Sequence, residues 1–93
     1  MNSDLDSKVV LVTGGAGGIG SVISKSFAKQ GAKVIVHYNN SKDKAEEIAK
    51  EIGGVAIKAD LTDAKQSKKL FDNIIDKEGK IDICIANAGN YPK

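Results

Sequence analysis

The sequence predicts an α/β fold in which one parallel sheet carries helices on both faces. Short apolar runs rich in β-branched residues alternate with longer segments whose apolar residues recur at helical spacing. Glycine-containing turns separate these segments, and no linker or low-complexity tract interrupts them. The 93 residues predict a single domain over 1–93, because two ordinary domains need a longer chain.

A strand, a loop and a helix are expected in the N-terminal third of the chain. Residues 8–13 form a run dominated by valine and leucine, which is typical of a strand buried on both faces. Residues 14–20 hold five of the ten glycines and predict a loop. A helix follows, and Gly31 stands where its C-terminus is expected. The apolar residues of this helix recur at helical spacing: Ile19, Val22, Ile23 and Phe27.

A second strand and a second helix are expected in the middle of the chain. Residues 33–37 predict the strand, and the two asparagines at 39–40 predict a turn after it. Ser41 can cap the helix, and the two glycines at 53–54 end it. The apolar stripe of this helix consists of Ala45, Ile48, Ala49 and Ile52.

The last part of the chain predicts a strand, a helix and a fourth strand. Residues 55–59 form the third strand, and Thr62 can cap the helix that follows. Gly79 ends this helix, and residues 81–86 form the fourth strand. One face of the helix carries Leu70, Phe71, Ile74 and Ile75.

The predicted element order is β-α-β-α-β-α-β with short connections. Strands joined through helices pair in parallel, and right-handed crossovers place those helices on the two faces of the sheet. The natural topology for this order is Rossmann-like, with strand order 3-2-1-4.

Composition excludes several classes of function. Fourteen basic and twelve acidic residues give a net charge of +2, and the lysines are dispersed, so no nucleic-acid partner is expected. The longest aliphatic run, 9–12, is too short to span a membrane, and residues 1–8 resemble no targeting peptide. A lone cysteine, Cys84, excludes an intrachain disulfide and favours a cytoplasmic location, and we expect it in the core. With His37 as the single histidine, no metal site is expected; this residue is interpreted as packed or on the surface.

The glycine-rich loop after the first strand has the position of a phosphate site. A helix N-terminus offers unpaired backbone N–H groups, and small residues allow a pyrophosphate to approach them. The loop follows a buried strand and opens a helix, which is the context such a site needs. Gly15, Gly17 and Gly20 fit the general pattern G-x-G-x-x-G. The alternative is a tight turn that needs positive φ, but five glycines in seven residues exceed what one turn requires.

Three motifs together resemble the short-chain dehydrogenase/reductase family. Thr13, Gly14, Gly18 and Gly20 fit its pattern T-G-x-x-x-G-x-G. The Asp-Leu-Thr-Asp segment at 60–63 resembles its adenine-side acidic motif. The Ala-Asn-Ala-Gly segment at 86–89 resembles its N-A-G motif. The resemblance covers nearly the whole chain but only the N-terminal part of such enzymes.

The resemblance implies a set of cofactor-binding residues. Around the pyrophosphate it implies Gly14, Gly18, Ile19 and Gly20. Near the adenine it implies Asp60, as acceptor for the amino group, and Leu61, through its backbone N–H. On the ribose side it implies Asn87, Ala88 and Gly89, and we place Tyr38, Asn39 and Ser41 near the adenosine ribose. The alternatives are structural: Asp60 or Thr62 as a helix cap, and Asn87 with Gly89 as a turn at the strand end.

The segment 36–42 bears on the choice between NAD and NADP. An acidic residue about 20 positions beyond the glycines binds the ribose 2′-OH of NAD, and this segment contains no carboxylate. Asn39, Asn40 and Ser41 supply neutral donors, and Lys42 supplies a positive charge. These residues favour NADP over NAD. A solvated turn is the alternative.

No catalytic residue is assigned. The family resemblance implies a tyrosine with a lysine four positions later on one helix, supported by a serine. Tyr38 and Lys42 have this spacing, but the asparagines at 39–40 break the segment before a helix can align them. Tyr91 has no residue four positions later.

The resemblance implies an NAD(P)-dependent oxidoreductase that transfers hydride between the nicotinamide cofactor and a small alcohol or carbonyl substrate. We expect the 93-residue chain to lack the catalytic half of such an enzyme and to be inactive alone. The alternatives are a non-catalytic dinucleotide-binding module and a self-associating fragment. The strand edge at 81–85 is expected to be unpaired, and such an edge can pair with a second copy of the chain to form a homo-oligomer.

Overall fold

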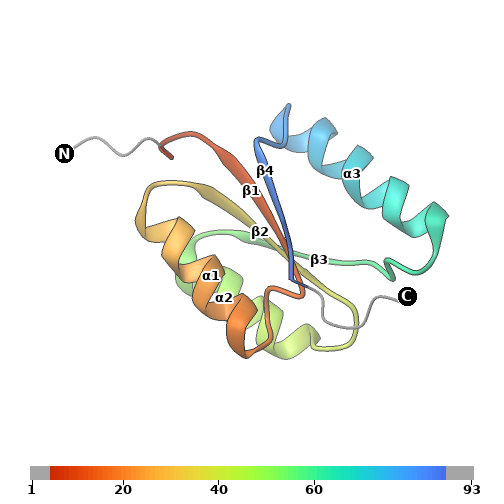
Figure 1. Cartoon of the computed structure of the whole chain (residues 1–93), viewed down its shortest axis with the longest axis horizontal. Helices are drawn as coiled ribbons and strands as arrows, with labels where there is room; N and C mark the ends of the chain where they lie inside the picture. The colour runs from red at the N-terminus through yellow and green to blue at the C-terminus, as the bar shows by residue number, and fades with distance from the viewer. Residues whose placement is uncertain (1–4, 88–93) are drawn as a thin grey trace.

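A computed structural model describes residues 5–87 of the chain. Its strands and helices alternate along the whole described part, as Figure 1 shows. The elements are β1 (Val9–Thr13), α1 (Gly18–Lys29), β2 (Lys33–Tyr38), α2 (Lys42–Ile52), β3 (Val55–Lys58), α3 (Ala64–Glu78) and β4 (Ile83–Ala86). The predicted element order is therefore confirmed.

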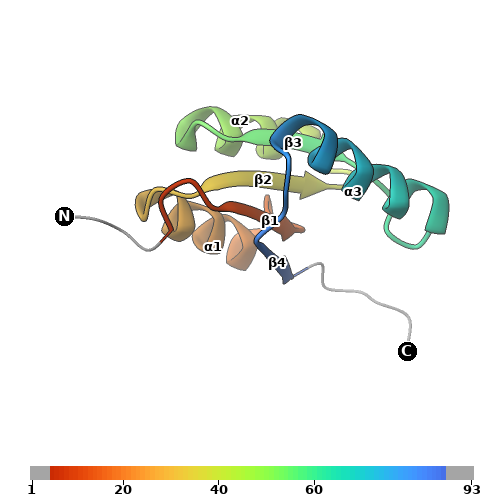
Figure 2. The same cartoon turned by 90° about the horizontal axis from the view of Figure 1, so that it is seen from above.

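The strands form one parallel sheet in the order β3-β2-β1-β4. This is the predicted Rossmann-like order 3-2-1-4. β1 lies between β2 and β4, so that Leu11 is opposite Ile35 on one side and Cys84 on the other. Figure 2 shows β4 next to β1 at one end of this order and β3 at the other.

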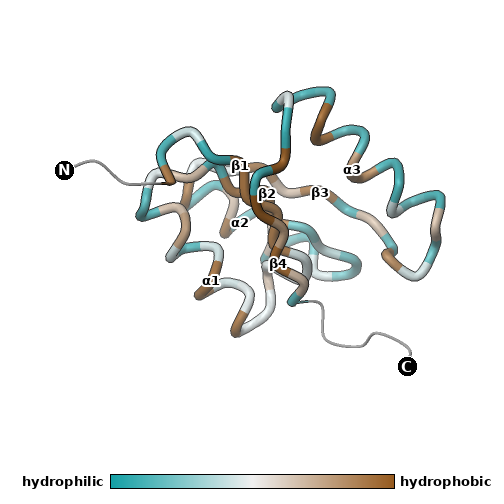
Figure 3. Tube along the Cα trace, turned by 45° about the horizontal axis from the view of Figure 1, so that its top comes forward, coloured by the Kyte–Doolittle hydropathy of each residue, from teal (hydrophilic) through white to brown (hydrophobic). Residues whose placement is uncertain are grey.

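Two apolar cores flank the sheet, because successive residues of a strand point to opposite faces. Val10 and Val12 of β1 lie in the first core with residues of α1 and α2. Val9 and Leu11 lie in the second core, which Leu70 of α3 helps to form. Figure 1 shows α3 on the opposite side of the strands from α1 and α2, and Figure 3 shows the hydrophobic colouring concentrated along the central strands.

Two of the predicted helix caps differ in the structure. Asp63, not Thr62, is the N-cap of α3, and its carboxylate accepts a hydrogen bond from the backbone N–H of Lys65. The Thr62 hydroxyl instead donates to Asp60, so the prediction of Thr62 as cap was wrong. Ser41 occupies the N-cap position of α2, but its side chain makes no capping bond there.

The apolar stripe predicted for α1 is only half in contact with the core. Ile19 and Val22 are 72% and 66% exposed, whereas Gly20 and Ser24 are the buried residues of the helix. Ile23 and Phe27 are partly buried and pack against the first core. In α3 the division is similar: Leu70 and Ile74 are buried, while the exposed apolar residues are Phe71 and Ile75.

Cys84 is exposed, so its prediction as a core residue was wrong. β4 is the last strand in the order of the described sheet, and its residues alternate in burial. Ile83 and Ile85 pack against the first core, and Cys84 points to the opposite face. Within residues 5–87 no helix is long and apolar enough to cross a bilayer.

Candidate functional site

The glycine loop joins β1 to α1 through a sharp turn. Gly14 has φ = +64°, a left-handed conformation that glycine adopts without the steric cost of a Cβ. Its carbonyl oxygen accepts a hydrogen bond from the backbone N–H of Gly17 (3.2 Å). Gly17 is the N-cap residue, so the chain enters α1 directly from this turn.

The N-terminus of α1 has the electrostatics of an anion site. The first N–H groups of an α-helix have no partners within the helix and carry a partial positive charge. No side chain caps α1, and its first turn contains no acidic residue. At α3, by contrast, the Asp63 carboxylate caps the helix N-terminus. The backbone of the glycine loop is therefore suited to receive a phosphate group from outside the chain.

Gly18 and Gly20 differ in what surrounds them, so the absence of a side chain has a different consequence at each position. A Cβ on Gly20 would collide with the carbonyl oxygen of Gly14 and lie 2.7 Å from Nδ2 of Asn87, so Gly20 is required by the packing of the loop. A Cβ on Gly18 would meet nothing within 4 Å among the described residues. The protein's own packing leaves space at Gly18, and this space is available to a ligand.

Asn87 connects the end of β4 to this loop. Its side-chain Nδ2 donates to the carbonyl oxygen of Gly14 (3.3 Å), and its backbone N–H donates to the hydroxyl oxygen of Thr13 (2.9 Å). The Thr13 hydroxyl in turn donates to the carbonyl of Ile85 (3.2 Å). The threonine and the asparagine of the two motifs thus fix the carboxyl ends of adjacent strands to one another.

His37 contributes to the site in a way that the sequence did not reveal. It is buried at the end of β2, and its Nδ1 accepts a hydrogen bond from the backbone N–H of Gly14 (3.0 Å). Its Nε2 lies 2.7 Å from the carbonyl oxygen of Ala59. Burial lowers the pKa of His37, and the bond to Ala59 opposes this shift to a smaller extent. The sequence carries no local signal for these contacts, because they join His37 to residues 23 and 22 positions away.

A pocket of about 690 Å³ opens where these segments meet, at the carboxyl ends of β1 and β2. This volume lies within the range of roughly 300–1,000 Å³ typical of small-molecule sites. Seven of the predicted site residues line it: Gly14, Gly18, Ile19, Tyr38, Asn39, Ser41 and Asn87. Ala16, Gly17, His37 and Asn40 complete the lining. Gly20 lies behind the loop and supports it.

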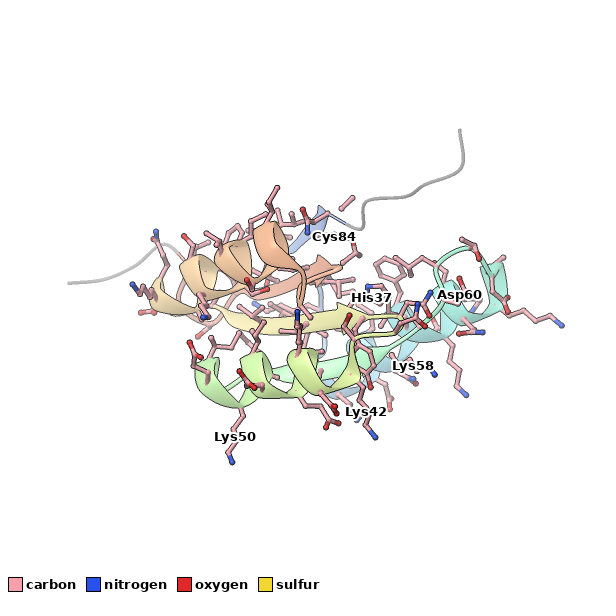
Figure 4. The ribbon with its side chains drawn as sticks, turned by 90° about the horizontal axis from the view of Figure 1, so that it is seen from below. His37, Lys42, Lys50, Lys58, Asp60 and Cys84 are labelled. Atoms are coloured by element: carbon pink, nitrogen blue, oxygen red, sulfur yellow. The ribbon has the colours of Figure 1, made fainter. Side chains whose placement is uncertain are left out.

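Asp60 and Leu61 do not line this pocket. Asp60 follows β3, and its carboxylate accepts hydrogen bonds from the hydroxyl (2.6 Å) and the backbone N–H (2.9 Å) of Thr62. These bonds hold the pKa of Asp60 below its ordinary value. Leu61 packs against the second core. Figure 4 shows Asp60 and His37 at the same end of the sheet. The predicted residues Ala88 and Gly89 lie outside the described residues.

Tyr38 and Lys42 occupy different elements. Tyr38 is the last residue of β2 and packs into the first core, and Lys42 is the first residue of α2. They do not share a helix face. Among residues 5–87, no three His, Cys, Asp or Glu side chains gather into a group able to hold a metal ion.

The position of the pocket defines the class of the protein. Chain order reverses between β1 and β4, and open parallel sheets bind ligands beside the carboxyl ends of their strands at such a switch point. A glycine-rich loop opening an uncapped helix there is the arrangement of a dinucleotide-binding fold. The family model of the short chain dehydrogenases matches residues 8–93, and the chain belongs to this family.

Known proteins resemble the chain along most of its length. Elsinochrome reductase 1 of Elsinoe fawcettii is 45% identical over 92 residues, which covers 94% of this chain and 34% of that protein. A dehydrogenase/reductase structure from Sinorhizobium meliloti 1021 superposes with a TM-score of 0.88 at 35% identity, over 94% of this chain and 36% of that one. A short chain dehydrogenase from Burkholderia cenocepacia J2315 in complex with NADP has a TM-score of 0.88 at 34% identity, over 95% and 38% of the two chains. The chain therefore spans about a third of the length of these relatives.

Proposed function

We propose that this chain is the cofactor-binding part of an NAD(P)-dependent oxidoreductase. The complete enzyme would transfer a hydride between the nicotinamide ring and a small alcohol or carbonyl compound. The observation that carries the proposal is the N-terminus of α1, which has no side-chain cap, no acidic residue and open space at Gly18. These features fit a pyrophosphate bound by backbone N–H groups. The family and the reductases among its relatives agree with this proposal.

Each segment around the pocket has a part in the proposed site. The pyrophosphate lies against the loop and first turn of α1, and the adenosine ribose lies at the turn after β2. The adenine reaches beyond the pocket to the end of β3, where the carboxylate of Asp60 accepts from its amino group. The residues assigned to these groups are Gly14, Gly18, Ile19, Gly20, Tyr38, Asn39, Ser41, Asp60 and Leu61. Asn87, Ala88 and Gly89 are assigned to the ribose side.

NADP is the proposed cofactor in preference to NAD. The turn after β2 contributes Asn39, Asn40 and Ser41 to the pocket, and Lys42 begins α2 directly after them. No carboxylate occurs from 36 to 42 to repel a 2′-phosphate. Ser41 lines the pocket, its hydroxyl makes no capping bond to α2, and its O–H can donate to a ligand. The related Burkholderia structure contains NADP, which supports the same choice.

We propose that the 93 residues bind the cofactor without turnover. The nicotinamide ring of the bound cofactor supplies hydride chemistry, but a general acid must also be aligned with the substrate. Tyr38 and Lys42 are not aligned for that task, because one ends a strand and the other begins a helix. We also propose a cytoplasmic location, since the single cysteine fits a reducing compartment.

Isothermal titration calorimetry of the 93-residue chain tests this proposal. We expect saturable binding of one NADP⁺ per chain and weaker binding of NAD⁺. 2′-AMP and 5′-AMP serve as a matched pair of fragments, because they share the adenosine and differ only in whether the phosphate is on the 2′ or the 5′ oxygen of the ribose. Absence of heat with both dinucleotides at millimolar concentration would contradict the proposed site. Tighter binding of NAD⁺ would contradict the preference alone.

Self-association is a second candidate function, supported by the edge strand β4 and by exposed apolar side chains. β4 ends the described sheet and has a paired neighbour on one side only, and exposed strand edges pair readily with other chains. Ile19, Val22, Phe71 and Ile75 add exposed apolar area on both faces. Sedimentation velocity over a hundredfold range of concentration tests this candidate. A homo-oligomer predicts a sedimentation coefficient that rises with concentration, and a constant monomer value excludes it.

A further inference from the structure

The imidazole of His37 joins three segments that the proposed function requires to act together. It belongs to β2, accepts from the Gly14 N–H in the loop after β1, and reaches the Ala59 carbonyl directly after β3. The backbone of His37 adds a further link, because its carbonyl accepts from the N–H of Gly15 (3.0 Å). The residue is 3% exposed, so water does not compete for these positions.

The two hydrogen bonds fix the protonation state of the ring. The Ala59 carbonyl can only accept, so Nε2 must carry a hydrogen. The Gly14 backbone nitrogen can only donate, so Nδ1 must present its lone pair. Both bonds therefore exist only with the neutral Nε2–H tautomer. A second proton on Nδ1 would leave two donors facing one another and the Gly14 N–H without its acceptor.

We propose that His37, as the neutral Nε2–H tautomer, is a positioning residue that holds the glycine loop in its cofactor-binding conformation. The proposal rests on the proposed function, because it assigns the loop to the pyrophosphate. His37 acts through Gly14, which lies at the left-handed turn that directs the chain into α1. Through Ala59 it also sets the distance between the pyrophosphate loop and Asp60, the next residue in the chain. Protonation of the ring releases the loop and weakens cofactor binding.

The surroundings of His37 favour the neutral ring. Its hydrogen-bond partners are backbone groups of Gly14 and Ala59, and no carboxylate that could stabilise a charged ring is bonded to it among the described residues. The nearest titratable and charged groups in chain and register are Tyr38, Lys58 opposite Tyr38 on β3, and Asp60. Lys42 at the start of α2 lies at the same end of the sheet (Figure 4).

Three substitutions at His37 separate its two contacts. The shorter amide introduced by His37→Asn ends where Nδ1 lies, so its oxygen can accept from Gly14 without titrating. The longer amide introduced by His37→Gln ends where Nε2 lies, so it can keep the Ala59 bond and lose the Gly14 bond. His37→Leu keeps apolar volume and removes both bonds. Thermal melts without cofactor show which variants are folded before binding is measured.

The first readout is the Kd for NADP⁺ from pH 4.5 to 8, a range that extends well below the ordinary pKa of histidine because burial lowers the pKa of His37. At neutral pH we expect His37→Gln and His37→Leu to bind about tenfold more weakly than wild type, as for a buried N–H left without an acceptor. His37→Asn should restore binding to within about threefold of wild type. On acidification the wild type should lose affinity more steeply than His37→Asn. Ionisation of the 2′-phosphate affects both proteins equally, so the difference between their pH profiles reports the protonation of the His37 ring.

The second readout needs no variant. His37 is the only histidine, so ¹⁵N chemical shifts of an untagged chain give the tautomer of this one ring without assignment. We expect a protonated Nε2 and an unprotonated Nδ1 at neutral pH. An Nδ1–H tautomer, equal affinity of the Asn and Gln variants, or identical pH profiles of wild type and His37→Asn would each overturn the inference. Wild-type binding of NADP⁺ together with any of these results would leave the proposed function intact; absence of wild-type binding would overturn both.

Discussion

The side-chain amide of Asn87 donates to the carbonyl oxygen of Gly14 across 3.3 Å, although the two residues are 73 positions apart in the chain. The backbone N–H of the same asparagine donates to the Thr13 hydroxyl. The chain thus secures the glycine loop from the β4 side through Asn87 and from the β2 side through His37. A loop held from both sides needs little reorganisation when a ligand binds, and this preserves affinity.

Removal of the Thr13 hydroxyl should destabilise the domain. Thr13→Val keeps the shape of a buried side chain but leaves the Asn87 N–H without this acceptor. The same N–H also donates to the carbonyl of Ile85 (3.1 Å), so we expect a loss of about 0.5–1.5 kcal/mol in the free energy of unfolding, measured by urea denaturation. Thr62→Val is the control, since that hydroxyl is exposed, and should change stability much less. Equal losses in the two variants would contradict the role given to Thr13.

Alanine substitutions at Gly18 and Gly20 should separate binding from folding. Gly18→Ala should keep the melting temperature, because its Cβ meets no described atom within 4 Å, but should weaken NADP⁺ binding by at least about tenfold through collision with the pyrophosphate. Gly20→Ala should lower the melting temperature, because its Cβ collides with the Gly14 carbonyl. Calorimetry and thermal melts of both variants make the comparison. Undiminished affinity in Gly18→Ala would remove Gly18 from the site.

A carboxylate at position 39 should reverse the cofactor preference. Asn39 lines the pocket at the turn after β2, where the proposed 2′-phosphate lies. Asn39→Asp should lower the affinity for NADP⁺ by about tenfold or more through like-charge repulsion, and should affect NAD⁺ much less. Asn73→Asp adds the same charge on α3, outside this pocket, and should leave the ratio of the two Kd values unchanged. The ratio is obtained by titrating each variant with both dinucleotides.

Asp82 should make stability depend on pH in the acid range. Its carboxylate accepts from the Val9 backbone N–H (2.7 Å) and pairs with Lys80, and the Val9 bond is the main cause of a lowered pKa. A carboxyl whose pKa is lower in the folded state stabilises the fold above its ordinary titration range, and this stabilisation is lost as the pH falls through the lowered value.

Urea denaturation at a series of pH values below about 5 tests this expectation. Asp82→Asn should flatten the fall in stability, whereas Asp72→Asn, which removes the same charge from exposed α3, should preserve more of the slope. An unchanged slope in Asp82→Asn would show that another group controls the acid range.

The sheet could be predicted from the sequence because its strands and their order follow from patterns that are visible along the chain. The valine-rich run of β1 marks a strand buried on both faces, and parallel pairing follows from the intervening helices. Gly53 and Gly79 end α2 and α3 in left-handed conformations, as their positions indicated. These features depend on local conformation and periodicity, which neighbouring residues determine.

The wrong predictions in α1 and β4 concern side-chain burial, which tertiary packing determines. Helical spacing cannot show that Gly20 and Ser24 are buried while Ile19 is exposed, since this depends on which side of α1 faces the sheet. The exposure of Cys84 depends on which face of β4 is covered by a core, and among the described residues only the face with Ile83 and Ile85 is. The site shows the same division. The motifs predicted the glycine loop and the turn after β2 as binding segments, and both line one pocket. The contact between His37 and Gly14 joins residues 23 positions apart and has no local signal.

Thermal unfolding of the 93-residue chain with and without NADP⁺ tests the central claim most directly. If the glycine loop is a dinucleotide site, NADP⁺ at 100 times its Kd should stabilise the native state by about 2.7 kcal/mol and raise the melting temperature visibly in a domain of this size. NAD⁺ at the same concentration should raise it less. A cooperative transition that neither dinucleotide moves would contradict the account.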